Sequence, residues 1–336
     1  MKTIKNPILK GFNPDPSIIR VGDDYYIATS TFEWFPGVQI HHSKDLIHWK
    51  LIAHPLKRLT QLNMLGEDSS CGVWAPCLSY HNNKYYLVYS DVKAHLYDVH
   101  NYLVTADEIT GDWSEPIALH GLGFDASLFH DDDGRKWLVS MISDSRKGKS
   151  LFGGIVLQEY SEEQKKLIGS YTNIFKGTEL GTTEGPHIYK RNGYYYLLTA
   201  VGGTGLRHAV TIARSRFIQG PYEVCPDNPI LTARYAPENP LQKAGHADIV
   251  ETQSGDWYMV HLCSRPIARK GRCILGRETA IQKIEWTEDG WIRLSGGGNQ
   301  PFLEVAAPAL PECEWSGLPS RDDFNSEELN INFQTL

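Results

Sequence analysis

Five segments of the chain share one pattern, and this internal repeat constrains the fold more than any other feature of the sequence. Each segment passes from a short apolar stretch through a turn rich in Gly, Asp and Asn into an aromatic stretch, which is typical of a β-hairpin. The segments begin at Asp15, Ala75, Asp125, Glu184 and His246. The second aromatic residues of the segments are Tyr26, Tyr86, Trp137, Tyr196 and Tyr258, at intervals of 60, 51, 59 and 62 residues. One hairpin therefore recurs along most of the chain.

Further strand-like stretches lie between the hairpins, at 40–52, 101–117 and 210–224, whereas long amphipathic helix patterns are scarce. Four strands in each of five units predict an all-β fold, a five-bladed β-propeller, because blades bury their faces by packing around an axis. We expect residues 1–310 to form this domain. An array of β-sandwiches is the alternative, but it predicts no fixed period near 60 residues.

Composition excludes several classes of partner. The 336 residues carry a formal net charge of −7, and no basic block could neutralise the phosphates of a nucleic acid. No apolar stretch approaches the length of a membrane span. The N-terminus lacks the apolar run of a secretory signal, so we expect a cytoplasmic protein. A homo-oligomer remains open.

The six cysteines contain no CxxC pair, and we interpret them as reduced thiols. The spacing of Cys71 and Cys77 fits no common zinc pattern.

Three carboxylates open repeats of the chain. In a propeller the first strand of each blade lines the central channel, so Asp15, Asp125 and Glu184 should occupy equivalent positions around it. Burying carboxylates together is unfavourable, because each loses water and repels its neighbours. A single Asp could cap a turn, and an acidic ring could hold a cation. Three carboxylates at equivalent positions favour a catalytic site.

Cleavage of a glycosidic bond needs such a set. One carboxyl protonates the leaving oxygen while another activates water or attacks the sugar carbon. Inverting enzymes hold the pair about 6.5–9.5 Å apart so that water fits between them, and carboxylates facing across a channel suit that spacing. A third carboxylate can raise the pKa of the acid by repulsion. The pattern alone does not assign the three roles.

Several stretches resemble glycoside hydrolase family 43, in particular its β-xylosidase branch. In order along the chain they are 6–20, 72–80, 123–139, 182–198, 242–252 and 273–286. The resemblance implies an inverting, exo-acting enzyme that releases xylose from the non-reducing end of short β-1,4-xylo-oligosaccharides. It also implies that Asp15 is the general base, Glu184 the general acid, and Asp125 the residue that orients the acid and tunes its pKa.

The resemblance implies further contacts with the sugar. Trp74 could stack on the pyranose face, Phe32 could close one side, and Thr204 is a weaker candidate. Arg277 could reach a hydroxyl of the terminal sugar with its several donors. Ordinary blade packing is the alternative for Phe32, and a salt bridge to Glu278 is the alternative for Arg277.

His246 resembles the residue that faces the central channel site, which often holds calcium in the family. A lone His is usually a hydrogen-bonded structural residue, and calcium prefers oxygen ligands. We therefore expect no required cofactor and keep His246 as a candidate ligand of a structural calcium.

Two departures from the family pattern affect the substrate. Ser143 stands where the β-xylosidase branch usually carries a Trp that helps to form the outer sugar subsite. Residues 311–336 are expected to be a linker and the start of an incomplete C-terminal β-sandwich, a domain that in this branch normally supplies an aromatic to the site. Three alternatives stay open: an α-L-arabinofuranosidase, alone or bifunctional, a non-catalytic sugar-binding propeller, and a structural propeller.

Overall fold

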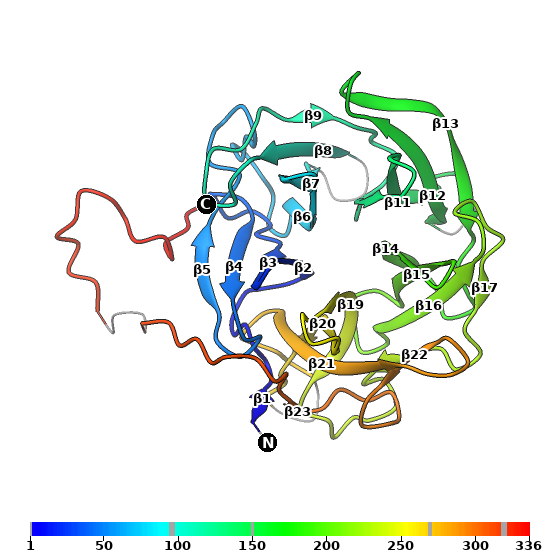
Figure 1. Ribbon diagram of the computed structural model, residues 1–336. Helices are drawn as coiled ribbons and strands as arrows, with labels where there is room; N and C mark the ends of the chain where they lie inside the picture. The colour runs from blue at the N-terminus through cyan, green and yellow to red at the C-terminus, as the bar shows by residue number, and fades with distance from the viewer. Residues whose placement is uncertain (1, 94–97, 149–150, 268–270, 317–320) are drawn as a thin grey trace.

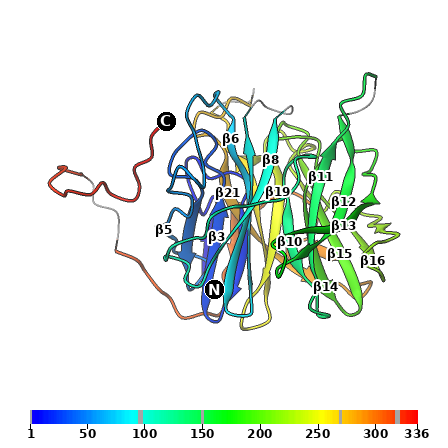
Figure 2. The ribbon, with the colours of Figure 1, turned by 90° about the horizontal axis from the view of Figure 1, so that it is seen from above.

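Five β-sheets surround a central axis in the computed structural model, which describes residues 2–93, 98–148, 151–267, 271–316 and 321–336 (Figure 1). The sheets stand upright side by side when the molecule is turned (Figure 2). Within the described ranges every regular element is a strand. The prediction of an all-β, five-bladed propeller is therefore confirmed.

The strands of each blade follow one another in the chain and pair in sequence order. The first blade contains β2 (Ser17–Val21), β3 (Asp24–Thr29), β4 (Gln39–Ser43) and β5 (Lys50–Ala53). The second contains β6 (Gly72–His81), β7 (Lys84–Val92), β8 (Val99–Ala106) and β9 (Ile117–Ala118). The third contains β10 (Ser127–His130), β11 (Lys136–Ser143), β12 (Phe152–Ser161) and β13 (Lys166–Phe175). The fourth contains β14 (Thr183–Arg191), β15 (Tyr194–Val201), β16 (Ala209–Ser215), β17 (Glu223–Val224) and the short β18 (Leu231–Thr232), which also pairs with β16. The fifth contains β19 (Gln242–Glu251), β20 (Trp257–Ser264), β21 (Glu278–Trp286) and β22 (Ile292–Leu294).

The first two strands of each blade are the predicted hairpins, and the first strands contact one another around the axis. The aromatic residues of the second strands fill the space between blades. Tyr26 meets Tyr85 of the next blade edge to face at 6.0 Å, and Tyr196 meets Trp286 at 4.7 Å. Burying large apolar side chains of this kind contributes about 1.5–3 kcal/mol each, so the aromatic repeat explains how the blades hold together.

The N-terminal segment closes the ring against the fifth blade. β1 (Thr3–Lys5) pairs with β23 (Glu304–Ala306) in a separate two-stranded sheet. The Asn6 side chain donates to the carbonyl of Ile281 and accepts from its N–H, at 2.6 and 2.8 Å. These contacts place the residues just before Asp15 beside the last blade.

After β23 the chain runs back to the outside of the first blade (Figure 1). Thr335 and Phe35 exchange backbone hydrogen bonds at 2.8 and 2.9 Å, and Ile331 O lies 2.9 Å from His54 Nε2. Residues 311–316 and 321–336 form no strand, and the expected start of a β-sandwich stays a prediction. No helix of membrane-crossing length and hydropathy occurs in the described part of the chain.

Candidate active site

One left-handed backbone position recurs in every blade, within the first strand or two residues before it. Asp15 illustrates the position: it lies four residues before Ile19, which pairs with Tyr26. The equivalent residues and their φ angles are Asp15 (54°), Ala75 (36°), Asp125 (56°), Gly185 (55°) and His246 (48°). A left-handed backbone costs a residue other than Gly about 1–2 kcal/mol, and such strain concentrates at functional sites. We call these five the left-handed positions.

Glu184 does not occupy a left-handed position, which corrects one expectation from the repeat. In the fourth blade Tyr189 pairs with Tyr196, so the residue equivalent to Asp15 is Gly185. The spacing to the second aromatic is misleading here. Asp125 and Glu184 both lie twelve residues before the second aromatic of their blades, whereas Asp15 lies eleven residues before it. For Asp125 the extra residue lies in a longer hairpin loop, but for Glu184 there is no longer loop, and the residue simply lies one position earlier in its strand.

Glu184 instead shares its strand position with two aromatic residues. Trp74 and Phe124 each directly precede a left-handed residue, as Glu184 does. The register agrees, since Trp74 pairs with Ser90 in the way that Glu184 pairs with Ala200. The site is thus built from two successive positions of the repeat.

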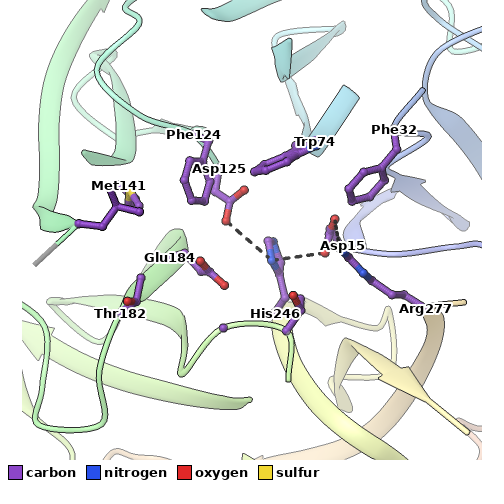
Figure 3. A pocket seen from close by; sticks show the side chains of 13 residues that line it. Asp15, Phe32, Trp74, Phe124, Asp125, Met141, Thr182, Glu184, His246 and Arg277 are labelled. Carbon is purple, nitrogen blue, oxygen red and sulfur yellow. Dashed lines mark ion pairs between the residues drawn. The ribbon is translucent and has the colours of Figure 1, made fainter. Parts of the chain in front are cut away.

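A pocket of about 360 Å³ opens at the end of the propeller where the carboxylates lie (Figure 3). Its lining residues are Asp15, Phe32, Trp74, Phe124, Asp125, Met141, Leu151, Thr182, Glu184, Gly203, Thr204, His246 and Arg277. The structure therefore brings together all eight residues that the sequence singled out. Of the five additional lining residues, Phe124 could have been found by the repeat, because it holds the position of Trp74.

Asp15 is buried and its two oxygens meet different neighbours. Oδ2 accepts a hydrogen bond from the Ser30 hydroxyl at 2.8 Å and lies 4.0 Å from the Arg277 guanidinium. Oδ1 lies 3.7 Å from His246 Nδ1. The side chain is only 7% exposed, so this carboxylate faces the pocket with few competing solvent contacts.

Asp125 is also buried and is tied to the blade that carries Glu184. Its Oδ2 accepts a hydrogen bond from the backbone N–H of Gly185 at 3.0 Å and lies 3.9 Å from His246 Nδ1. Burial first, and then repulsion by Glu184 and Asp15, raise the pKa of Asp125 well above its ordinary value, against the smaller effect of the Gly185 N–H. A neutral Asp125 is favoured while its neighbours are charged.

Glu184 has the environment of a carboxylic acid. Burial raises its pKa to about 7, and the negative charge of Asp15 acts in the same direction, while Arg277 lowers it. The charged neighbour that raises this pKa is Asp15. A pKa near neutrality suits a group that must give up a proton at the working pH.

Three aromatic rings form one wall of the pocket (Figure 3). The Trp74 ring lies 5.9 Å from Phe32 and 5.5 Å from Phe124, and its Nε1 donates to the carbonyl of Ser70 at 2.9 Å. Such a wall offers apolar ring faces to the C–H side of a sugar. Phe32 thus serves the pocket as well as the packing between blades.

Arg277 belongs to the pocket and not to the alternative salt bridge with Glu278. The Glu278 carboxylate is fully buried and binds Arg265 in a two-bond fork, at 2.7 and 2.9 Å. The Arg277 guanidinium instead packs over the Phe32 ring at 4.7 Å, near Asp15. Its remaining donors are available to a hydroxyl-rich ligand.

Thr204 and Ser143 lie at the edge of the site. Thr204 is half-buried in the loop after β15 and lines the pocket. Ser143 ends β11, its N–H donates to the carbonyl of Leu122 at 2.9 Å, and it is not among the lining residues, although Met141 of the same strand is. Ser143 therefore adds no side chain to the pocket wall next to Met141.

The side chains around the channel below the pocket supply few of the oxygen ligands that a calcium ion takes, and the structural calcium at His246 stays a prediction. A cavity of about 10 Å³ lies there, between Asp15, Asp125, His187 and His246, and it has room for about one water molecule. Calcium takes six to eight oxygen ligands, whereas the side chains around this cavity are two imidazoles and two carboxylates, and one oxygen of each carboxylate already accepts a hydrogen bond. Burial also holds the pKa of His246 below its usual value, which favours the neutral imidazole, the form that can bind a metal. Across the described ranges, three metal-ligand side chains gather closely only at surface residues His48, Glu312 and Glu314.

Comparison with known proteins agrees with this geometry. The chain is 58% identical to a β-xylosidase of Bacillus subtilis (strain 168) over 99% of its own length and 64% of the relative. It is equally 58% identical to xylosidase/arabinosidase 43B of Humicola insolens, over 100% of the chain and 63% of that protein. The crystal structure of a xylan β-1,4-xylosidase from Bacillus halodurans C-125 superposes with a TM-score of 0.97 at 61% identity, covering 99% of this chain and 64% of that one.

The chain thus spans somewhat less than two thirds of the length of these relatives. The sequence profile described as Glycosyl hydrolases family 43 matches residues 4–292, which include every lining residue of the pocket. The protein accordingly belongs to glycosyl hydrolases family 43.

Proposed function

We propose that this chain is the catalytic propeller of an inverting, exo-acting β-xylosidase. The observation that carries the proposal is the pairing of Glu184, whose pKa is raised to about 7, with Asp15 in one pocket. A proton donor and a carboxylate base from different blades are the two groups that inverting hydrolysis requires. Names of relatives such as β-xylosidase support xylose as the terminal sugar.

The mechanism assigns one role to each carboxylate. Asp15 takes a proton from a water molecule, whose oxygen attacks the anomeric carbon from the face opposite the leaving group. Glu184 gives its proton to the glycosidic oxygen as the bond breaks, and the anomeric configuration inverts. Asp125, through the Gly185 N–H, orients the acid. The proton that Asp15 receives is later lost to solvent, and Glu184 is reprotonated.

The shape of the site supports cleavage at a chain end. Below the pocket the channel narrows to a cavity of about 10 Å³, which excludes a sugar ring. A xylo-oligosaccharide therefore enters from one side and places its non-reducing sugar deepest, against Asp15 and the aromatic wall. Asp15 and Glu184 then lie on opposite sides of the bond to the second sugar.

α-L-Arabinofuranosidase activity is the second candidate. Two relatives support it: the Humicola insolens protein named xylosidase/arabinosidase 43B and, at 38% identity, a non-reducing end α-L-arabinofuranosidase of Bacteroides ovatus. The hydroxyls of the two terminal sugars can overlay in one pocket. Relative rates on nitrophenyl β-xyloside and nitrophenyl α-arabinofuranoside decide between them.

A non-catalytic sugar-binding propeller is the third reading. Sugar binding alone gives no reason to gather three carboxylates in one pocket and raise the pKa of two of them. Xylobiose binding by calorimetry without release of reducing sugar would favour this reading over catalysis.

The deciding experiment follows xylobiose hydrolysis by NMR and identifies the anomer formed first. We expect α-xylose from the non-reducing unit, before mutarotation equilibrates it. Asp15→Asn is the matched control, and we expect it to lower turnover by about 10²–10⁴-fold. Initial formation of β-xylose from the non-reducing unit would overturn inversion, and the absence of any turnover would overturn the proposed activity.

A further inference from the structure

The hydroxyl of Ser30 is fully buried between Asp15 and the second blade. It donates to Asp15 Oδ2 at 2.8 Å and accepts from the backbone N–H of Ala75 at 2.7 Å. We propose that Ser30 is a positioning residue for Asp15, fixing the plane of its carboxylate and so the direction in which the base oxygen points. This inference rests on the proposed function.

The direction of the Ser30 hydroxyl proton follows from its neighbours. The Ala75 N–H can only donate, so it occupies an acceptor site of the Ser30 oxygen. The single hydroxyl proton is then directed to Asp15 Oδ2. A hydrogen bond to a charged carboxylate is stronger than one between neutral groups. Among the residues that the structure describes, no other hydrogen bond to the Asp15 carboxylate is found.

The two oxygens of Asp15 are therefore not equivalent. Oδ2 is held by Ser30 and lies 4.0 Å from Arg277. Oδ1 faces His246 at 3.7 Å, beyond hydrogen-bond distance. Oδ1 has a free lone pair for the attacking water, and a rotation of the carboxylate away from this orientation lengthens the Ser30 hydrogen bond. Ser30 thus fixes the orientation of the Asp15 carboxylate.

The second blade provides a matched comparison for Ser30. Ser90 follows Tyr86 by four residues, as Ser30 follows Tyr26, and its hydroxyl also accepts a backbone N–H from the next blade, that of Asp125, at 3.2 Å. The Ser90 hydroxyl donates to Asn101 Oδ1 at 2.8 Å. The link between blades is common to both serines, whereas a hydrogen bond to a carboxylate belongs to Ser30.

The test separates the base from the acid by using two leaving groups. Loss of a general acid is severe for xylobiose and mild for nitrophenyl β-xyloside, because nitrophenolate leaves without a proton. A misoriented base slows the attack of water, and this slows the cleavage of both substrates equally. We expect Ser30→Ala to lower kcat by about tenfold on both substrates, with KM within twofold of the wild-type value. Glu184→Gln supplies the opposite pattern.

Ser90→Ala controls for the link between blades, and we expect its kcat to fall less than threefold on either substrate. Ser30→Cys has nearly the same size as the wild type and a weak donor, so its kcat should lie between those of the wild type and Ser30→Ala; it decides the matter where Ser30→Ala does not fold. Ser30 variants within twofold of wild type, or losses confined to xylobiose, would overturn the proposal. An inactive wild-type protein would instead overturn the proposed function, and this proposal with it.

Discussion

The Asp125 carboxylate accepts a hydrogen bond from the backbone N–H of Gly185, the residue directly after Glu184, at 3.0 Å. This contact crosses from the third blade to the fourth and reaches the segment that presents the acid. Gly185 has a φ of 55°, and a Cβ built there would lie 3.0 Å from the His246 ring. Asp125 thus acts on the orientation of Glu184 through the backbone N–H of Gly185 in the neighbouring blade.

The basic limb of the pH profile should report Glu184. A general acid must be protonated, and the pKa of Glu184 is raised to about 7, so kcat/KM should fall as the pH rises through about 7. Initial rates on xylobiose between pH 5 and 9 measure this limb. Activity that stays constant to pH 9 would show that another group is the acid.

The raised pKa of Glu184 also predicts that this side chain lowers the stability of the folded protein at high pH. A carboxyl whose pKa is higher in the folded protein than in the unfolded chain binds more protons when folded, so folding stability decreases as the pH rises between the two pKa values. Glu184→Gln removes this effect. We expect its free energy of unfolding to exceed that of the wild type at pH 8 by about 1 kcal/mol or more, and to differ little at pH 4. Denaturant titrations at both pH values check this, and a variant less stable at pH 8 contradicts it.

A chelator should leave the enzyme unaffected. The side chains around the cavity below the pocket supply few of the oxygen ligands that calcium takes. We expect EDTA treatment and dialysis to change neither the activity nor the melting temperature. A loss of activity that added Ca²⁺ reverses, and added Mg²⁺ does not, would contradict this reading of the channel.

The repeat in the sequence was sufficient to predict the propeller and to bring Asp15, Asp125 and His246 to one level. Hairpin turns and aromatic strands are local signals, and five copies of them leave few ways to bury both faces of each sheet. The repeat could not place Glu184 to within one residue, because loop length and strand register change the same spacing. Register is decided by pairing across strands, which a single strand does not encode.

The contacts that refine the site were out of reach of the sequence. Ser30 and Gly185 act on carboxylates of their own or another blade through single hydrogen bonds. Neither belongs to a motif of fixed spacing, and Ser is common in turns and strand ends. The place of Leu151 in the pocket wall depends likewise on how the chain runs between β11 and β12.

Trp74 should contribute mainly to sugar binding. Its ring stands in the middle of the aromatic wall, between Phe32 and Phe124, and takes no part in proton transfer. We expect Trp74→Ala to raise KM for nitrophenyl β-xyloside by up to about tenfold, because a stacked ring contributes about 0.5–1.5 kcal/mol. Trp74→Phe is the matched variant and should retain most of the affinity. Equal losses of kcat in both variants, with KM unchanged, would contradict the assignment.

Arg277 should affect both the sugar and the acid, in ways that can be separated. Its guanidinium lies 4.0 Å from Asp15 Oδ2, packs over Phe32 at 4.7 Å, and lowers the pKa of Glu184. Removing the charge in Arg277→Ala should therefore move the basic limb of kcat/KM to higher pH, while the loss of the guanidinium N–H groups that bind a sugar hydroxyl lowers kcat/KM by about 10–100-fold. Arg277→Lys keeps the charge and should keep the limb in place, although its single ammonium cannot reproduce the fork. A limb that moves to lower pH in Arg277→Ala would mean that the nearby positive charge is not what holds the pKa of Glu184 down.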